Sequence, residues 1–242
     1  MSYSHTLFML DIMKPGLAVD QEDPSGPAAR YQPALQPSQS ESHTGTYTLR
    51  SAAGKLCLKA TMGVGFTVVV QKKAWYFSVD PSMVLVSGSC GPDAATLTLT
   101  LPDHSASLQL TYTLQEDSVS YVSRLTAHIS PLPVCSGCSS KTYLGELTNT
   151  SLFVAPYGQS YRCTAQSAFV LTQELQVKLV PLQTQAFKVP DGGYGQEVMC
   201  QVDFNSIIVP TVLWATAAGL ALIAMLTYLV VKDRRPRGYE RL

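Results

Sequence analysis

The side chains best suited to covalent chemistry are six cysteines: Cys57, Cys90, Cys135, Cys138, Cys163 and Cys200. An even number of cysteines in an exported domain predicts a disulfide framework, because thiols pair and stay paired in oxidising compartments. Cys57 with Cys90, and Cys163 with Cys200, would each close a loop of about 35 residues, worth about 3–4 kcal/mol in the chain-entropy model. Spacing alone does not choose among the alternative pairings.

Cys135-Ser-Gly-Cys138 is a C-x-x-C pair, which can serve as a redox motif or as half of a zinc site. A zinc site would need a second ligand pair, and the four histidines of the chain are scattered. A redox thiolate would need a helix start, whereas the flanking Pro131, Pro133 and serines indicate a loop. The pair is therefore interpreted as a small local disulfide or as two inactive loop thiols.

No sequence motif indicates catalysis. The chain lacks a G-x-S-x-G elbow, an H-E-x-x-H pair and a phosphate loop. Its acidic residues form no cluster along the sequence, so an enzyme would require distant carboxylates that meet only in space. The formal net charge is +0, which gives no reason to expect nucleic-acid binding. We predict no enzyme activity, no cofactor and no metal site.

The chain ends in Gly238-Tyr239-Glu240-Arg241-Leu242. A short extended peptide can pair with a sheet edge of a partner while alternate side chains enter pockets, here those of Tyr239 and Leu242. Gly238 leaves the backbone free to approach. The pattern resembles the GYxxΦ sorting signal read by clathrin adaptor complexes. An alternative hypothesis takes Leu242 and its carboxylate as the ligand of a PDZ-type groove.

An uncharged apolar run over residues 207–231 precedes this tail and predicts one transmembrane helix. Pro210 falls in its expected first turn, where a missing N–H costs least. Lys232, Arg234, Arg235 and Arg237 follow the run, so the positive-inside rule places the tail, residues 232–242, in the cytosol. Small residues at positions 215, 217, 219 and 221 leave self-association through this helix open.

The middle of the chain, residues 46–204, predicts one all-β domain with two sheets or a barrel-like arrangement. Period-two alternation over residues 96–101, 108–114 and 169–180 is typical of half-buried strands, and turn residues separate these segments. Further expected strands cover residues 46–50, 66–70, 75–79, 119–129 and 185–189.

Residues 1–45 are rich in Pro, Ser and Gln and predict a flexible leading segment. Only the short run Thr6–Leu10 precedes Asp11, so we expect no standard signal peptide in this sequence. Either the true start differs, or the C-terminal span does the targeting. The second alternative would give a tail-anchored scaffold facing the cytosol, with basic residues across the membrane and cysteines in a reducing compartment.

The chain resembles the lysosome-associated membrane glycoprotein (LAMP) family over most of residues 45–242. Four ordered blocks and the tail carry the resemblance: LCLKA with MG at 56–63, SGSCG at 87–91, GQSYRC at 158–163, and QAFKV at 185–189 followed by YG at 194–195, Cys200, Asn205-Ser206 and Pro210. Single-domain members, of the dendritic-cell and macrosialin types, look most similar.

This resemblance implies that Cys57 pairs with Cys90 and Cys163 with Cys200, which leaves Cys135 and Cys138 to each other. It also implies a prism-like β domain in the lumen, a glycan coat, and residence in lysosomal and late endosomal membranes, with the plasma membrane as a further location. The sequence departs from the family in glycosylation, because Asn149-Thr150-Ser151 is its single N-x-S/T site.

We therefore predict a type I membrane glycoprotein with a structural or interaction role, one span, a clathrin adaptor as partner of its tail, and homo-oligomers as a further option. The alternative function is a cell-surface adhesion or scavenger-type receptor that cycles through endosomes. The sequence does not identify a lumenal ligand.

Overall fold

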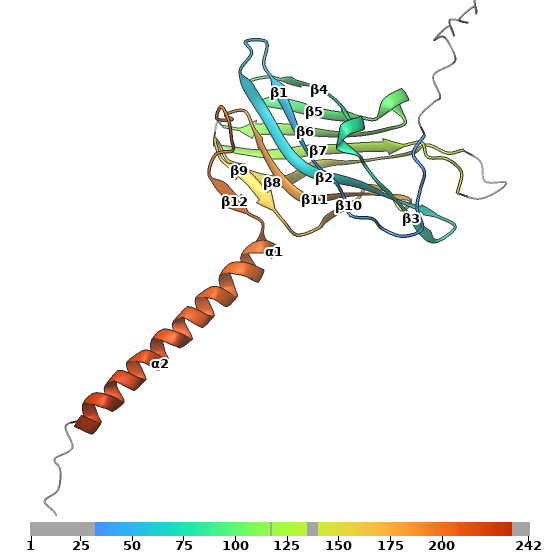
Figure 1. Cartoon of the computed structure of the whole chain (residues 1–242). Coiled ribbons are helices and arrows are strands. Elements are labelled where there is room, and N and C mark those ends of the chain that lie inside the picture. The colour runs from blue at the N-terminus through green and yellow to red at the C-terminus, as the bar shows by residue number, and fades with distance from the viewer. Residues whose placement is uncertain (1–31, 117, 135–139, 234–242) are drawn as a thin grey trace, which may run out of the picture. The chain divides into compact units, whose positions relative to one another are not determined.

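A computed structural model describes residues 32–116, 118–134 and 140–233 of the chain. In these residues two β-sheets share one hydrophobic core, and a long helix follows the last strand (Figure 1). The predictions for Cys135, Cys138, Gly238, Tyr239 and Leu242 concern residues outside the described ones.

The larger sheet has seven strands, and its hydrogen-bonded path runs β1-β2-β11-β9-β12, with β3 added beside β2 and β10 beside β11. Neighbours are antiparallel except β9 and β12, which pair in parallel. The strands are β1 Thr44–Arg50, β2 Leu56–Val70, β3 Lys73–Ser78, β9 Ser160–Cys163, β10 Ser167–Val170, β11 Leu175–Ala186 and β12 Glu197–Met199.

The second sheet is a five-stranded antiparallel meander in the order β4-β5-β6-β7-β8. Its strands are β4 Leu85–Cys90, β5 Ala94–Thr100, β6 Ala106–Gln115, β7 Val119–Ile129 and β8 Tyr143–Pro156. Two short 3-10 turns, η1 Pro81–Met83 and η2 Pro102–His104, connect strands of this region.

The core lies between the two sheets, and period-two alternation supplies it. On β6 the buried residues are Ala106, Leu108, Leu110, Tyr112 and Leu114, whereas the residues between them are more exposed. Each fully buried leucine of this kind contributes about 1.5–3 kcal/mol through removal of apolar surface from water. Buried side chains of β2 and β11 face them from the larger sheet, including Leu58, Met62, Leu175 and Leu179.

Residues 33–36, which the sequence places in the flexible leading segment, pack on the domain in the structure. Pro33 is buried, Leu35 packs against the core, and Gln36 pairs with Tyr76 of β3 through two backbone hydrogen bonds of 2.8 Å. An apolar side chain at position 35 therefore finds a partner surface that composition alone does not reveal. The division of the chain into segments otherwise stays a prediction.

The expected single strand over residues 169–180 is wrong, because the structure divides it into β10 and β11. The Thr172 hydroxyl accepts hydrogen bonds from the N–H groups of Glu174 and Leu175, at 3.3 and 3.0 Å. This local side-chain bond closes a tight turn, so the two halves fold back and pair with each other.

The helical segment begins at α1 Gln201–Asp203, continues through a π-helical turn at Phe204–Ile208, and ends with α2 Val209–Asp233. Pro210 therefore lies inside the helical segment and not in its first turn. The wide turn directly before Pro210 fits the loss of one backbone donor there, and the Thr211 hydroxyl donates to the Ile207 carbonyl at 2.7 Å.

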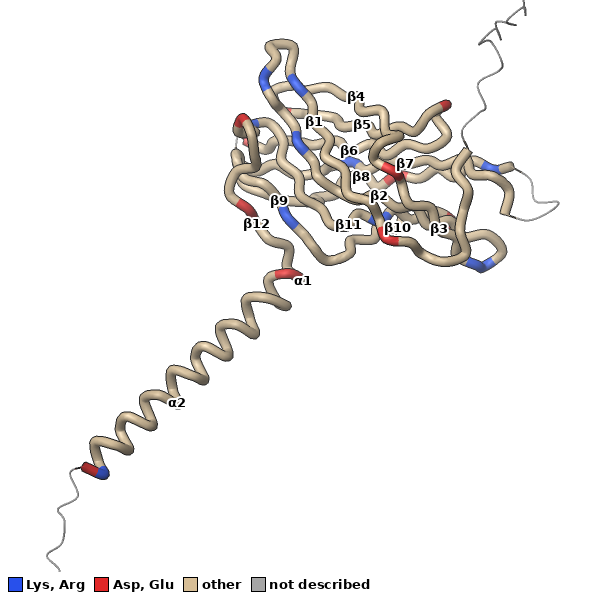
Figure 2. Tube along the Cα trace, in the orientation of Figure 1, with Lys and Arg blue, Asp and Glu red and all other residues tan. Residues whose placement is uncertain are grey.

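Among the described residues, one helix, Gln201–Asp233, is long and apolar enough to cross a membrane, with a mean hydropathy of 2.1. The 25 residues of α2 span about 37 Å at a rise of about 1.5 Å per residue, against a hydrocarbon core of about 30 Å. Figure 2 shows no charged residue along α2 before its last turn. The predicted all-β domain with two sheets, two disulfides and one C-terminal apolar helix is confirmed, while its prism-like arrangement stays a prediction.

Candidate functional site

Two disulfides hold the β domain, and each joins different parts of it. Cys57 on β2 bonds to Cys90 at the end of β4, with Cα atoms 6.3 Å apart, so this bridge links the two sheets. Cys163 at the end of β9 bonds to Cys200, the residue between β12 and α1, with Cα atoms 5.2 Å apart. These are the two pairs that the sequence resemblance implies.

The junction between the domain and the helix is built around Asp203, which is 4% exposed. One carboxylate oxygen accepts from the N–H and the hydroxyl of Thr164, and the other accepts from the N–H of Ala165 at 3.0 Å. Thr164 and Ala165 directly follow β9. Three donors on one buried carboxylate tie the first helical turn to the domain, because hydrogen bonds to a charged acceptor are stronger than neutral ones.

A second polar contact supports the same region. Arg162 on β9 donates to the carboxylate of Glu197 on β12 at 2.7 Å, and Gln183 donates to the other oxygen of that carboxylate at 3.0 Å. The pair is about half exposed and contributes about 0–1 kcal/mol. Asp203 and the disulfide therefore carry most of the attachment.

Cys163, Cys200 and Asp203 place ligand-type atoms within 4.8 Å of one another. Both sulfurs are bonded to each other, so neither offers the thiolate that a zinc ion requires. The cluster therefore acts as a structural fastening. The sequence analysis did not identify Asp203 as a site residue; its place three residues after Cys200 is the signal that was available.

Asn149, the predicted glycan acceptor, lies exposed on β8 at an irregularity of the strand. Its φ is 55°, and residues 149–151 lie between the paired positions Thr148↔Arg124 and Leu152↔Val122. The strand pairing is thus irregular at the N-x-S/T sequence. Ser151, which supplies the required hydroxyl, is exposed as well.

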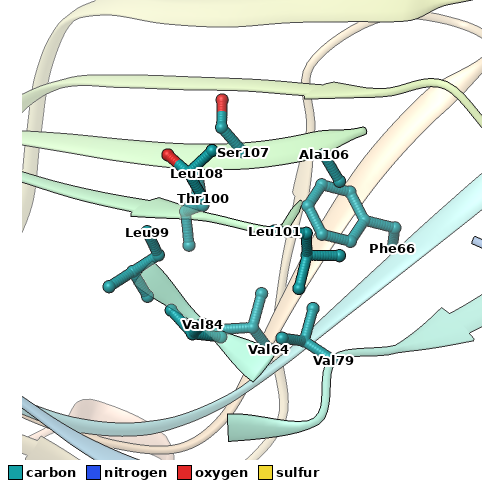
Figure 3. A pocket seen from close by; sticks show the side chains of 10 residues that line it. All are labelled: Val64, Phe66, Val79, Val84, Leu99, Thr100, Leu101, Ala106, Ser107 and Leu108. Carbon is teal, nitrogen blue, oxygen red and sulfur yellow. The ribbon is translucent and has the colours of Figure 1, made fainter. Parts of the chain in front are cut away.

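A small apolar cavity between the sheets offers no ligand site. Its volume is about 10 Å³, at the lower limit for a single water molecule. Figure 3 shows Phe66, Val64, Val79 and Leu101 converging on it. A space of this size and lining is a packing imperfection of the core.

Two linked β-sheets and one apolar helix define a single-span membrane protein with a folded domain on one side of the bilayer. The family model described as "Lysosome-associated membrane glycoprotein 2-like, luminal domains" matches residues 32–201. The chain therefore belongs to the lysosome-associated membrane glycoprotein family, and it is a single-pass type I protein of the lysosomal membrane. Members of this family are named as membrane glycoproteins, not as enzymes.

Curated relatives extend the likeness beyond the domain. Human lysosome-associated membrane glycoprotein 3 is 29% identical over 214 residues, 87% of this chain and 49% of that protein. Lysosome-associated membrane glycoprotein 2 of Cricetulus griseus is 26% identical over 209 residues, 86% of this chain and 49% of that protein. The chain thus spans about half the length of the curated relatives it matches.

Solved structures agree with the fold. The crystal structure of human LAMP-3 has a TM-score of 0.58 and 29% identity, and the match covers 66% of this chain and 99% of that one. The membrane-proximal domain of mouse LAMP-1 also has a TM-score of 0.58, at 22% identity, covering 67% of this chain and 99% of that one. The second likeness concerns the fold alone.

Proposed function

We propose that this glycoprotein is a structural or interaction component of the limiting membrane of lysosomes and late endosomes, delivered there by its cytosolic tail. The observation that carries the proposal is the chain order of a disulfide-linked β domain, one apolar helix and a basic segment ending in Gly238-Tyr239-Glu240-Arg241-Leu242. This order favours an oxidising lumen for the disulfide-linked domain and the cytosol for the tail.

The tail would bind a clathrin adaptor complex through Tyr239 and Leu242. Lys232 to Gly238 can extend about 23–25 Å, enough to present the two side chains away from the lipid surface. In an extended peptide the pocket residues alternate with solvent-facing ones, so Glu240 contributes little to binding. Tyr239→Ala should move the protein to the plasma membrane at steady state, measured by surface biotinylation, whereas Glu240→Ala should leave it in lysosomes.

Two results would contradict this sorting proposal. An unchanged steady-state distribution of Tyr239→Ala would mean that the tail does not direct the protein, as expected for a surface receptor that cycles through endosomes. A loss of sorting when two residues are appended after Leu242 would favour a PDZ-type partner, because such a groove binds the free carboxylate.

The lumenal orientation has a separate test. Protease treatment of intact vesicles should leave the β domain intact, and non-reducing mass mapping should recover the Cys57–Cys90 and Cys163–Cys200 peptides as linked pairs. Digestion of the domain in sealed vesicles would place it in the cytosol and refute the orientation.

Asn149 is the proposed site of the single N-linked glycan. Its exposure, its positive φ and the irregular pairing of β8 at residues 149–151 support a surface position that can carry a glycan. Asn149→Gln should remove one endoglycosidase-sensitive glycan, and Asn205→Gln should remove none. Self-association through α2 remains a further proposal, checked by crosslinking of full-length chains.

A further inference from the structure

A cleft of about 360 Å³ opens beside the Cys57–Cys90 disulfide, at one end of the two sheets. Residues from the β1–β2 turn, the β4–β5 turn, the end of β8 and the segment after β11 line it. Lys55, Tyr157, Phe187 and Lys188 are its large side chains. The volume falls within the range of about 300–1,000 Å³ that is usual for sites of small ligands.

The charge of this cleft is one-sided. Lys55 and Lys188 contribute two ammonium groups, and no Asp or Glu is among the described residues that line it. The Lys188 ammonium lies 5.6 Å from the centre of the Tyr157 ring, a cation–π distance that holds the two side chains together. Neither lysine forms a salt bridge within the part of the chain that the structure describes, so the two ammonium groups attract an anion.

The walls of the cleft are held in place before any ligand arrives. Phe187 has a φ of 69°, a conformation that costs energy for a residue with a side chain, and its N–H donates to the Cys57 carbonyl at 2.7 Å. The disulfide fixes Cys57 in turn. Gly158 lies close to the stem of Lys188, because a Cβ built at Gly158 would lie 3.4 Å from Lys188 Cδ.

The two aromatic rings decide what kind of anion fits. Tyr157 and Phe187 line the cleft beside the ammonium groups, whereas a bare inorganic ion would use only those groups and leave the aromatic part of the lining in water. A ligand with a ring beside its anionic group uses both parts of the lining, in the way small-molecule sites combine apolar walls with few polar groups.

We propose that this cleft binds a small organic anion in which a carboxylate or sulfate is carried on a sugar ring. The anionic group pairs with Lys55 and Lys188, and the ring lies against Tyr157 and Phe187. The proposal concerns the β domain alone and does not depend on the tyrosine signal of the tail.

The test uses the full-length chain in detergent and measures saturation-transfer difference NMR and titration with N-acetylneuraminate, a carboxylate on a sugar ring. N-Acetylmannosamine is the matched neutral sugar, and sodium sulfate is the matched bare anion. N-Acetylneuraminate should bind and should bind more weakly as ionic strength rises, because exposed ammonium groups are screened by salt. Both matched compounds should bind at least about tenfold more weakly.

Variants assign the binding to the cleft. Lys188→Met and Lys55→Met should each weaken binding about tenfold, since each removes one charge-assisted hydrogen bond. Lys72→Met is the matched control, because Lys72 is exposed in the turn at the opposite end of β2 from Lys55. Lys55 is exposed in a hairpin turn, so its variant carries the test even if Lys188→Met folds poorly.

Four results would overturn the proposal: no binding of N-acetylneuraminate at millimolar concentration, equal binding of the neutral sugar, equal binding of sulfate, or an equal loss in Lys72→Met. Each of these results would refute the cleft proposal and leave the sorting proposal untouched, because none of them concerns the location of the protein in cells.

Discussion

Asp203→Asn should open the junction between the β domain and the helix without unfolding the two sheets. The carboxylate uses both oxygens, one for Thr164 and one for Ala165. Asparagine offers one carbonyl oxygen and one amide that can only donate, so one buried N–H loses its acceptor. The side-chain shape barely changes, which makes the hydrogen-bond loss the main effect.

The size of the effect follows from those bonds. A buried donor left without an acceptor costs about 1–3 kcal/mol, and the bonds that remain weaken when the acceptor loses its charge. The local opening free energy should therefore fall by about 2–4 kcal/mol. Since about 1.4 kcal/mol is a factor of ten, exchange of the Thr164 and Ala165 amides should accelerate about 30- to 1,000-fold.

Mass spectrometry of the peptide that contains both amides measures their rate of hydrogen exchange directly. Asp191→Asn is the matched control, because Asp191 is an exposed carboxylate in the loop before β12. Core peptides from β6 should keep their protection in both variants. Unchanged exchange at Thr164 and Ala165 in Asp203→Asn would refute the role of the carboxylate in holding the junction.

Two other predictions concern the β domain. Burial raises the pKa of Tyr194 to about 12, so the folded state keeps a proton that the unfolded state loses above a pH of about 10, and stability falls between these values. Tyr194→Phe, which also loses the 2.8 Å bond to the Thr61 hydroxyl, should cost about 1 kcal/mol at neutral pH but flatten the alkaline loss in urea titrations. Gly195→Ala should destabilise by at least about 2 kcal/mol in the same assay, since its Cβ would lie 2.1 Å from the Gly158 carbonyl oxygen. Gly219→Ala, with nothing within 4 Å, should change domain stability by less than about 0.5 kcal/mol.

Strands with regular alternation could be predicted from the sequence. Val119–Ile129 agrees with β7, and Leu108–Leu114 lies within β6, because every second side chain of these strands enters the core. The apolar helix could be predicted for a different reason, since an uninterrupted apolar run of this length has few alternatives to a membrane span.

Strand β8 could not be predicted in this way, although it is 14 residues long. Residues 149–151 face a single position on β7, and a second register shift follows between Leu152 and Ala155, so the alternation of buried and exposed side chains is interrupted in the middle of the strand. The same bulge is what exposes Asn149. A local irregularity thus concealed the element and at the same time created its candidate modification site.

Contacts between residues far apart in the sequence are a second feature that could not be predicted. Asp203 contacts Thr164 across 39 residues, and Lys55 and Lys188 reach one cleft from the β1–β2 turn and from the segment after β11. Local pattern carries no information about such meetings. The segments that resemble the family include Cys163, Phe187 and Cys200 and so indicate which regions matter. Only the folded structure shows which side chains of those regions contact each other.

The shortness of β12 explains why the junction is fastened twice. Three residues pair in parallel with β9, and an isolated pairing of this size would open easily, because few hydrogen bonds oppose the entropy of a free chain end. The Cys163–Cys200 bridge prevents separation of the strand ends, whereas the Asp203 carboxylate fixes the first helical turn on β9. The disulfide limits the distance between the ends of β9 and β12, and the carboxylate holds the first helical turn against Thr164 and Ala165.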